Sequence, residues 1–180
     1  MSARNERPRP DEYNPYYQRY IERVPPGDIV NLLRDQLADT RELLRRVPAG
    51  AGDFAYAPGK WSIKEVVGHI MDAERIFTYR ALRFAREDAT PLPGFDQDTY
   101  VPAGRFGDRP LGQLVEELSA VRGATVAFFN GLPDDAWPRV GDANGSPASV
   151  RALATITAGH ELHHRAILEE RYLAALPIRS

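Results

Sequence analysis

Apolar residues recur with the period of an α-helix along four long segments of this 180-residue chain. No segment alternates apolar and polar residues strongly enough to compete as a half-buried strand. Four long helices joined by connections of different lengths predict an all-α fold, specifically a four-helix bundle. The expected helices cover residues 28–47, 62–88, 111–130 and 146–176.

Local signals mark where three of these helices begin. Asp28 and Ser62 are suited to cap helix N-termini, because a short side-chain oxygen accepts a hydrogen bond from a free backbone N–H. Glu65 follows Ser62 by three residues, which completes a capping box. Ser146 followed by Pro147 predicts the start of the last helix, since proline is favoured at the first helical position.

Two segments lie outside the predicted helices. Residues 1–26 form an expected N-terminal arm with four tyrosines, so we expect its later part to pack on the bundle domain of residues 27–180. Residues 90–109 form a long Pro/Gly-rich connection between the second and third helices, and an irregular connection of this length is often functional. The candidates for lid residues, with core packing as the alternative, are Tyr16, Tyr17 and Phe95.

The composition excludes several classes of protein. The 23 basic and 25 acidic side chains give a formal net charge of −2, which offers no basic field for nucleic acid. No apolar run approaches the roughly 18 residues of a membrane span, and the polar N-terminus lacks the apolar core of a signal peptide. We therefore expect a cytoplasmic protein that binds neither nucleic acid nor membrane. The oligomeric state is open, with a homodimer as one alternative.

The chain uses histidine at only four positions, and their spacing predicts a metal site. His160 and His164 are spaced i, i+4, which places both imidazoles on one face of the last helix. His69 lies in the apolar stripe of the second helix, so it points inward or toward a cleft. The chain has no cysteine, so nitrogen and oxygen must supply the ligands. We expect His69, His160 and His164 to bind one divalent ion. The alternatives are arrangements that use His163, or histidines that simply pack in the core.

His160 to His164 also match the H-E-x-x-H pattern of zinc proteases, in which the glutamate activates water. Only sixteen residues follow His164, and an all-helical chain offers no edge strand to hold a peptide. We therefore interpret the match as incidental for proteolysis. Glu161 stays the one catalytic candidate, as a base beside the metal, and a solvated helix residue is the alternative interpretation.

Residues 61–69 (WSIKEVVGH) and 159–164 (GHELHH) together resemble the DinB/YfiT-like superfamily of four-helix bundles. The resemblance spans about residues 28–176, and the order of the elements and the long connection agree with it. It implies a three-histidine metal site at His69, His160 and His164, with zinc as the first candidate and nickel as the second. It leaves the role of His163 open.

The resemblance also implies an enzyme. The better understood members of this superfamily transfer low-molecular-weight thiols, such as bacillithiol or mycothiol, to electrophiles, and others have been described as hydrolases. Three neutral imidazoles leave the full charge on a divalent ion, which can lower the pKa of a thiol or of water. We expect first a metal-dependent thiol S-transferase, second a hydrolase of a small amide or ester, and third a non-catalytic bundle stabilised by its metal.

Overall fold

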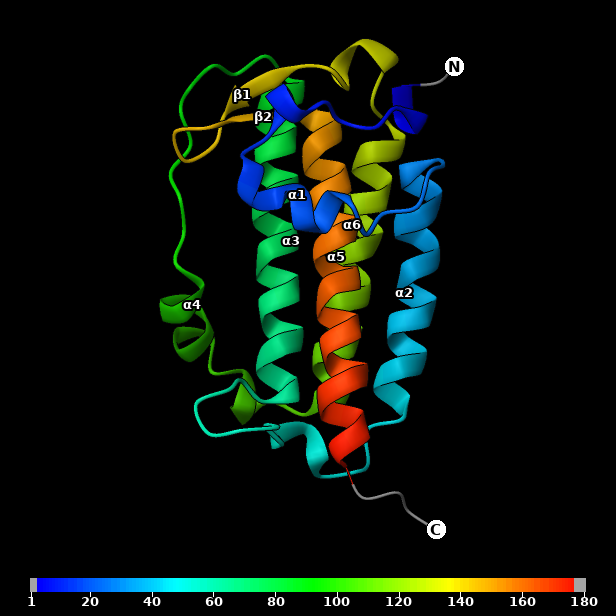
Figure 1. Cartoon of the computed structure of the whole chain (residues 1–180), viewed down its shortest axis with the longest axis vertical. Helices are drawn as coiled ribbons and strands as arrows, with labels where there is room; N and C mark the ends of the chain where they lie inside the picture. The colour runs from blue at the N-terminus through cyan, green and yellow to red at the C-terminus, as the bar shows by residue number, and fades with distance from the viewer. Residues whose placement is uncertain (1–2, 177–180) are drawn as a thin grey trace.

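The computed structural model describes residues 3–176 and shows four long helices lying side by side (Figure 1). They are α2 (Ile29–Arg45), α3 (Ile63–Ala85), α5 (Leu111–Asn130) and α6 (Val150–Ile167). Helices α2 and α3 each pack against both α5 and α6, so the four helices form a closed ring around the core. This arrangement confirms the predicted all-α four-helix bundle. Residues 1–2 of the predicted arm (residues 1–26) and residues 177–180 of the predicted bundle domain (residues 27–180) lie outside the described residues.

Shorter elements complete the molecule. Helix α1 (Gln18–Ile21) crosses α6 as part of the arm, and α4 (Gln97–Gly104) lies beside α3. Strands β1 (Val140–Asp142) and β2 (Pro147–Ser149) form an antiparallel hairpin. The remaining elements are a π-helical turn, η7 (Leu168–Tyr172), and the 3-10 turns η1 (Ala3–Asn5), η2 (Pro10–Glu12), η3 (Pro15–Tyr17), η4 (Ala51–Asp53), η5 (Phe106–Asp108), η6 (Asp134–Ala136) and η8 (Leu173–Ala175).

The predicted starts of α2 and α3 are confirmed. The Asp28 carboxylate accepts hydrogen bonds from the backbone N–H groups of Val30 and Asn31 at 2.8 and 3.1 Å. At α3 the Ser62 hydroxyl accepts from the Glu65 N–H at 3.3 Å, and the Glu65 carboxylate accepts from the Ser62 N–H at 2.7 Å. These bonds satisfy donors that have no partner inside the helix, and they fix where each helix begins.

The predicted start of the last helix at Ser146 and Pro147 is wrong. Pro147 begins strand β2, where it pairs with Asp142 of β1. Proline lacks the N–H that a central strand needs, but it is tolerated at a sheet edge, and this hairpin has only edges. Helix α6 begins instead after Ser149, whose hydroxyl accepts a hydrogen bond from the Ala152 N–H at 3.0 Å.

The expectation of an irregular connection over residues 90–109 is met only in part, because the connection contains α4. The Asp96 carboxylate caps this helix by accepting a backbone N–H at 3.0 Å. Upstream of the helix, the N–H of Leu92 donates to the carbonyl of Asp142 at 3.0 Å, and the carbonyl of Leu92 accepts from the Asn144 N–H at 2.8 Å. The connection is therefore tied to the hairpin just before it turns into α4.

The later part of the arm packs on the bundle, as its tyrosines predict. Tyr20 is buried, and Gly159 of α6 permits its close approach: a Cβ atom at position 159 would lie 2.1 Å from the backbone oxygen of Tyr20. The buried Glu12 carboxylate accepts hydrogen bonds from the Ser149 hydroxyl at 2.9 Å and from Arg151 Nε at 2.7 Å. Apolar, backbone and ionic contacts together fix the arm.

A buried ion cluster links all four long helices, and we call it the arginine cluster. Arg122 of α5 donates to both carboxylate oxygens of Glu74 on α3 at 2.9 Å and to Glu161 on α6 at 2.7 Å. It also donates to the carbonyl of Leu33 on α2 at 2.8 Å, and Glu161 accepts a further hydrogen bond from Thr40 at 2.5 Å. Burial lowers the pKa of Arg122, but the two carboxylates raise it above its usual value, so the guanidinium stays charged.

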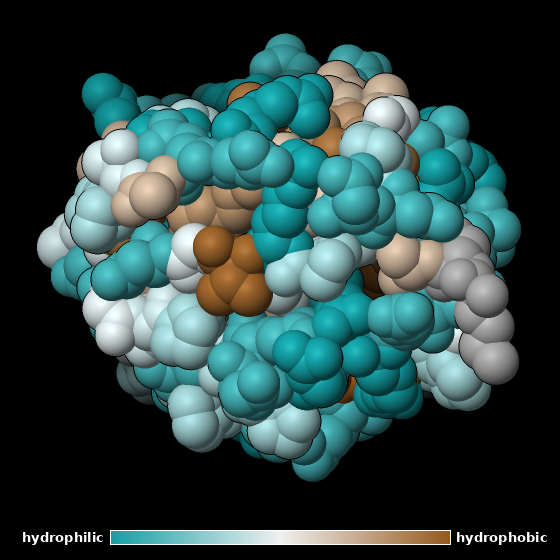
Figure 2. Space-filling model, turned by 90° about the horizontal axis from the view of Figure 1, so that it is seen from above, coloured by the Kyte–Doolittle hydropathy of each residue, from teal (hydrophilic) through white to brown (hydrophobic). Residues whose placement is uncertain are grey.

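The end of the molecule that carries the arm and the hairpin has a mostly hydrophilic surface. Figure 2 shows this end from above, with apolar residues scattered among polar ones. Within residues 3–176, no helix combines the length and the apolar character that a membrane crossing requires.

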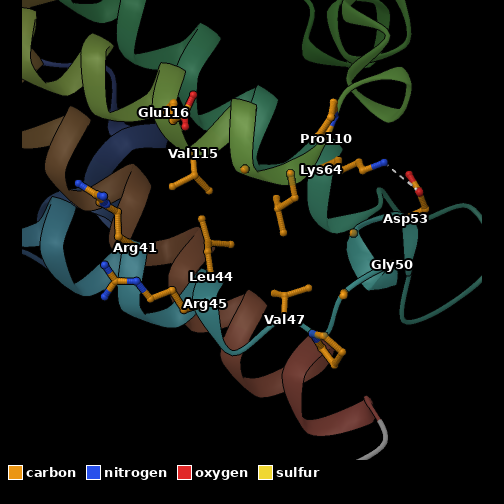
Figure 3. A pocket seen from close by; sticks show the side chains of 15 residues that line it. Arg41, Leu44, Arg45, Val47, Gly50, Asp53, Lys64, Pro110, Val115 and Glu116 are labelled. Atoms are coloured by element: carbon orange, nitrogen blue, oxygen red, sulfur yellow. Dashed lines mark hydrogen bonds and ion pairs between the residues drawn. The ribbon is translucent and has the colours of Figure 1, made fainter.

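A cavity of about 560 Å³ lies between the end of α2 and the start of α5 (Figure 3). Its apolar lining includes Leu44, Val47 and Val115, and Arg41 and Arg45 lie along one edge. No histidine lines this cavity, so it is separate from the predicted metal site.

Candidate metal centre

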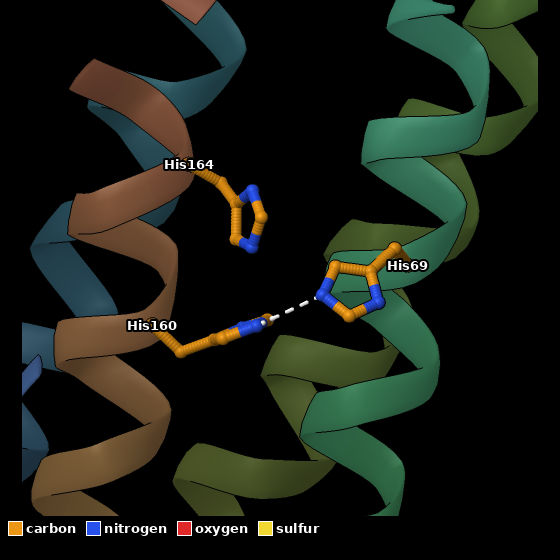
Figure 4. Close-up of side chains that lie close together, drawn as sticks. All are labelled: His69, His160 and His164. Carbon is orange, nitrogen blue, oxygen red and sulfur yellow. Dashed lines mark hydrogen bonds between the residues drawn. The ribbon is translucent and has the colours of Figure 1, made fainter. Parts of the chain in front are cut away.

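Three histidines from two neighbouring helices converge in the core of the bundle (Figure 4). His69 comes from α3, whereas His160 and His164 come from successive turns of α6. The Nε2 atoms of His69 and His160 are 3.0 Å apart, and one ring nitrogen from each histidine lies within 4.8 Å of the others. The structure therefore brings together the three residues that the spacing singled out, and we call them the histidine cluster.

Burial keeps these imidazoles neutral. His69, His160 and His164 are only 3%, 5% and 9% exposed. Burial, with a smaller contribution from neighbouring imidazoles, lowers the pKa of His69 to about 4 and that of His164 to about 2. The same causes hold the pKa of His160 well below its usual value. Each neutral ring carries one lone pair, which is the form that binds a metal ion. In the His69–His160 pair one Nε2 donates its N–H to the other Nε2, so an ion bound to both would replace this hydrogen bond.

The donor set and its geometry fit a divalent transition-metal ion. In a tetrahedral site with metal–nitrogen distances of about 2.0–2.1 Å, the ligand nitrogens lie roughly 3.3 Å apart. The His69 and His160 nitrogens, 3.0 Å apart, are close to this spacing, and all three ligand nitrogens lie within 4.8 Å of one another. Imidazole suits zinc and nickel alike, so both predicted ions fit.

Aromatic rings enclose the histidine cluster. Between ring centroids, Trp61 lies 4.8 Å from His69, and Tyr20 and Phe77 lie 5.3 and 5.8 Å from His160. The sequence pointed to the tyrosines of the arm, but it did not mark Trp61 or Phe77 as neighbours of the site. Their apolar positions are typical of ordinary core residues, and only the fold shows what they pack against.

The other polar residues named from the sequence lie around the cluster rather than in it. Glu161 accepts hydrogen bonds from Arg122 and Thr40 and is 1% exposed, so the interpretation of Glu161 as a solvated helix residue is wrong. His163 is partly exposed, with its ring 5.3 Å from that of Tyr20. It is not among the three histidines whose nitrogens converge.

A cavity of about 380 Å³ opens onto the histidine cluster. His69 and His160 line it, and its size falls in the range of small-molecule sites. The arm and the connection supply most of the other residues that line the cavity. The three expected lid residues, Tyr16, Tyr17 and Phe95, are among them. The lining also includes Tyr20, Asp96 and Asp98. The two aspartates were not singled out in the sequence, because nothing local distinguishes them from solvated loop residues.

The fold and the site together define the class of this protein. It is a four-helix bundle that carries a candidate three-histidine metal centre beside a small cavity. The model of the DinB superfamily matches residues 32–168, and the chain belongs to this superfamily. The match extends from the first turn of α2 to the end of α6 and includes all three histidines.

Two solved structures from Bacillus subtilis share the fold. One is YfiT, described as a probable metal-dependent hydrolase with an unusual four-helix bundle topology. It is 16% identical, with a TM-score of 0.72 over 92% of this chain and 91% of that chain. The other is YjoA, a DinB-like protein that is 21% identical, with a TM-score of 0.59 over 84% of this chain and 96% of that chain. No curated protein matches the chain.

Proposed function

We propose that this protein is a metal-dependent enzyme that transfers a low-molecular-weight thiol to an electrophile, with His69, His160 and His164 as the metal ligands. One observation carries the proposal. Ring nitrogens of the three histidines converge within 4.8 Å beside a cavity that can hold a small organic substrate. Structural zinc sites are closed by four protein ligands, whereas catalytic sites typically use three and keep a position free.

The chain prepares this site in two ways. Because burial keeps the imidazoles neutral, no proton has to leave them before an ion binds. The rings of Tyr20, Trp61 and Phe77 limit the contact of the cluster with bulk water. A bound zinc or nickel ion would supply Lewis acidity, which lowers the pKa of a thiol or of water.

Two reactions compete for this site. Thiol transfer is supported by the resemblance of the two histidine-bearing segments to a superfamily whose better understood members use thiols such as bacillithiol or mycothiol. Hydrolysis of a small amide or ester is the second candidate, and the similarity to YfiT, itself described as a probable metal-dependent hydrolase, supports it. Both reactions need the same ligands and the same cavity, and they differ in the nucleophile.

Three narrower points stay predictions. Glu161 as a general base is one, and the hydrogen bonds from Arg122 and Thr40 to its carboxylate weigh against it. A cytoplasmic location is the second. A homodimer is the third, and sedimentation analysis at micromolar concentration would test it.

Metal analysis tests the ligands. After loading with zinc and desalting, the wild-type protein should retain about one ion per chain. His69→Ala and His164→Ala should each lose most of this ion while they keep the helical circular dichroism spectrum. His163→Ala is the matched control and should retain the ion. Full zinc retention in both His69→Ala and His164→Ala would refute the ligand assignment. Unfolding of the wild-type protein on chelation would indicate a structural role instead.

A thiol panel tests the reaction. Bacillithiol, mycothiol, cysteine and glutathione are each offered with the electrophile monochlorobimane to the zinc- and nickel-loaded protein. We expect metal-dependent consumption of monochlorobimane with one of the thiols, and loss of that activity in His69→Ala. If no thiol supports turnover while aryl esters or amides are cleaved, thiol transfer is wrong and the hydrolase interpretation replaces it.

A further inference from the structure

We propose that the cavity beside the histidine cluster selects substrates that carry a positively charged amine on a flat apolar body. The inference names the class of the electrophilic or hydrolysable substrate, not of the thiol, and it rests on the proposed function for the reaction. Binding itself depends only on the residues that line the cavity.

Charge is the first argument. Apart from the histidines, the ionisable residues that line the cavity are tyrosines and two aspartates, Asp96 and Asp98, and no lysine or arginine lines it. Both aspartates are exposed at the start of α4, and one Asp96 oxygen accepts the N–H of Asp98 at 3.0 Å. Within residues 3–176, neither carboxylate pairs with a basic side chain. Two carboxylates without a counter-ion favour a cation in the cavity and repel an anion.

Aromatic walls are the second argument. Five rings line the cavity, and edge-to-face contacts join some of them: Tyr17 lies 6.0 Å from Phe77, and Phe77 lies 6.5 Å from Phe95. The faces of such rings carry negative potential and attract ammonium groups, and they stack on flat apolar groups. The remaining two rings belong to Tyr16 and Tyr20.

Two of these rings already form cation–π contacts with arginines of the protein. The guanidinium of Arg19 lies 4.0 Å from the centroid of the Tyr16 ring, and that of Arg80 lies 5.9 Å from the centroid of the Phe95 ring. Neither arginine lines the cavity, and Arg80 donates to the backbone carbonyl of Pro93 at 2.7 Å. These contacts show that both rings accept a cation, on the sides where the two arginines lie. The two guanidinium charges offset part of the field of the aspartates, so we expect a moderate preference.

The rim that carries the aspartates is fixed. Gly94 lies so close to Asn144 that a Cβ atom at position 94 would be 2.4 Å from Asn144 Oδ1. The Asn144 N–H also donates to the carbonyl of Leu92 at 2.8 Å. These contacts anchor the chain just before the aspartates, and a fixed rim discriminates between ligands better than a mobile one because less ordering entropy is lost on binding.

Three probes of matched shape test the inference. 2-Phenylethylammonium, 2-phenylethanol and 3-phenylpropionate share a phenyl ring and differ in charge. Each is titrated by NMR into the full-length protein, with and without zinc, at low ionic strength. The ammonium should bind about fivefold more tightly than the alcohol, and the carboxylate should bind more weakly than the alcohol. Added salt should reduce this preference.

Variants assign the preference to the rim. The double variant Asp96→Asn/Asp98→Asn should lose most of the preference for the ammonium over the alcohol and keep only the part that the aromatic rings supply, and asparagine keeps the cap of α4. Asp35→Asn, an exposed carboxylate on α2, is the matched control and should keep the fivefold preference. Equal binding by the wild-type protein, an unchanged preference in the double variant, or no shifts at cavity residues would overturn the inference. Since the titration involves no turnover, such a failure leaves the proposed function standing. If the protein prefers the ammonium in the titration but shows no metal-dependent activity in the thiol and ester assays, the proposed function is refuted and the inference about binding stands.

Discussion

The bundle buries two polar clusters that differ in how their charge is compensated. In the arginine cluster, the guanidinium of Arg122 meets the carboxylates of Glu74 and Glu161. In the histidine cluster, three neutral bases face one another, and none of the hydrogen bonds within residues 3–176 joins them to a carboxylate. Buried charges need partners, whereas neutral imidazoles tolerate burial and keep their lone pairs free. The first cluster is suited to hold helices together, and the second to receive a cation.

The two clusters share the same helices. On α6, His160 and Glu161 are neighbours in the sequence, but successive side chains point about 100° apart around the helix. His160 therefore faces His69 on α3, while Glu161 faces α2 and α5. A single position on α6 separates the two roles, so substitutions can disrupt one cluster and spare the other.

The largest effect is expected from Arg122→Met. Removing the guanidinium leaves two carboxylates buried without a counter-ion, which should lower the free energy of unfolding by about 3–5 kcal/mol. Urea denaturation followed by circular dichroism measures this loss. Arg45→Met is the matched control, because Arg45 forms an exposed pair with Glu42 and should change stability by at most about 1 kcal/mol. A loss below about 1 kcal/mol in Arg122→Met would show that the arginine cluster does not hold the helices together.

The next largest effect concerns the histidine cluster. Zinc at about one hundred times its dissociation constant should raise the free energy of unfolding by about 2.7 kcal/mol, because it binds the folded state only. In His164→Ala this increment should nearly vanish, whereas a stable Arg122 variant should keep it. Thermal denaturation with and without zinc gives both values. Equal stabilisation of the wild-type protein and His164→Ala would remove the distinction between the clusters.

A smaller effect tests the arm, whose Tyr20 ring packs against His160 of the histidine cluster. Gly159→Ala places a methyl group 2.1 Å from the backbone oxygen of Tyr20, so the arm must shift, at a cost of about 1–3 kcal/mol. Gly123→Ala on α5 is the control. Nothing lies within 4 Å of its Cβ position, and replacing a helical glycine there should stabilise the protein by about 0.5–1 kcal/mol. The same sign of change in both variants would contradict the close contact of the arm with α6.

The smallest effect depends on pH. Burial raises the pKa of Glu12, but hydrogen bonds from Arg151 and Ser149 outweigh it and hold the pKa below the usual 4.5. Its contribution to stability is therefore complete above about pH 4.5 and is lost as the pH falls through the lower pKa of the folded state. Glu12→Gln should be about 1 kcal/mol less stable than wild type at pH 7, since Arg151 keeps Glu6 as a partner. Urea curves at several pH values should show this difference shrinking below pH 4.5, and a constant difference would contradict the ionic role of Glu12.

The sequence predicts those features whose signal is local. The caps at Asp28 and Ser62 and the alignment of His160 with His164 follow from spacing along single helices, because a helix converts spacing directly into direction. Adding His69 from α3 also requires the predicted bundle and the resemblance to the superfamily. Together these signals predict all three residues of the candidate metal centre.

Features that depend on the meeting of distant segments could not be predicted. Arg122 resembles a surface residue of α5 until the fold places Glu74 and Glu161 beside it. Ser146 and Pro147 suit a helix start and a strand edge equally well, and pairing with β1 decides between them. Asp96 and Asp98 gain their significance only because α4 lies next to the histidine cavity.

The backbone contact between Gly159 and Tyr20 has a consequence for biosynthesis. The arm is synthesised before α6, the surface on which it docks. Until α6 has been made, the tyrosines of the nascent arm lack their binding partner, and one wall of the cavity is missing. The cavity beside the histidines is therefore completed only when these two distant segments meet, so translation products that stop before α6 cannot assemble it.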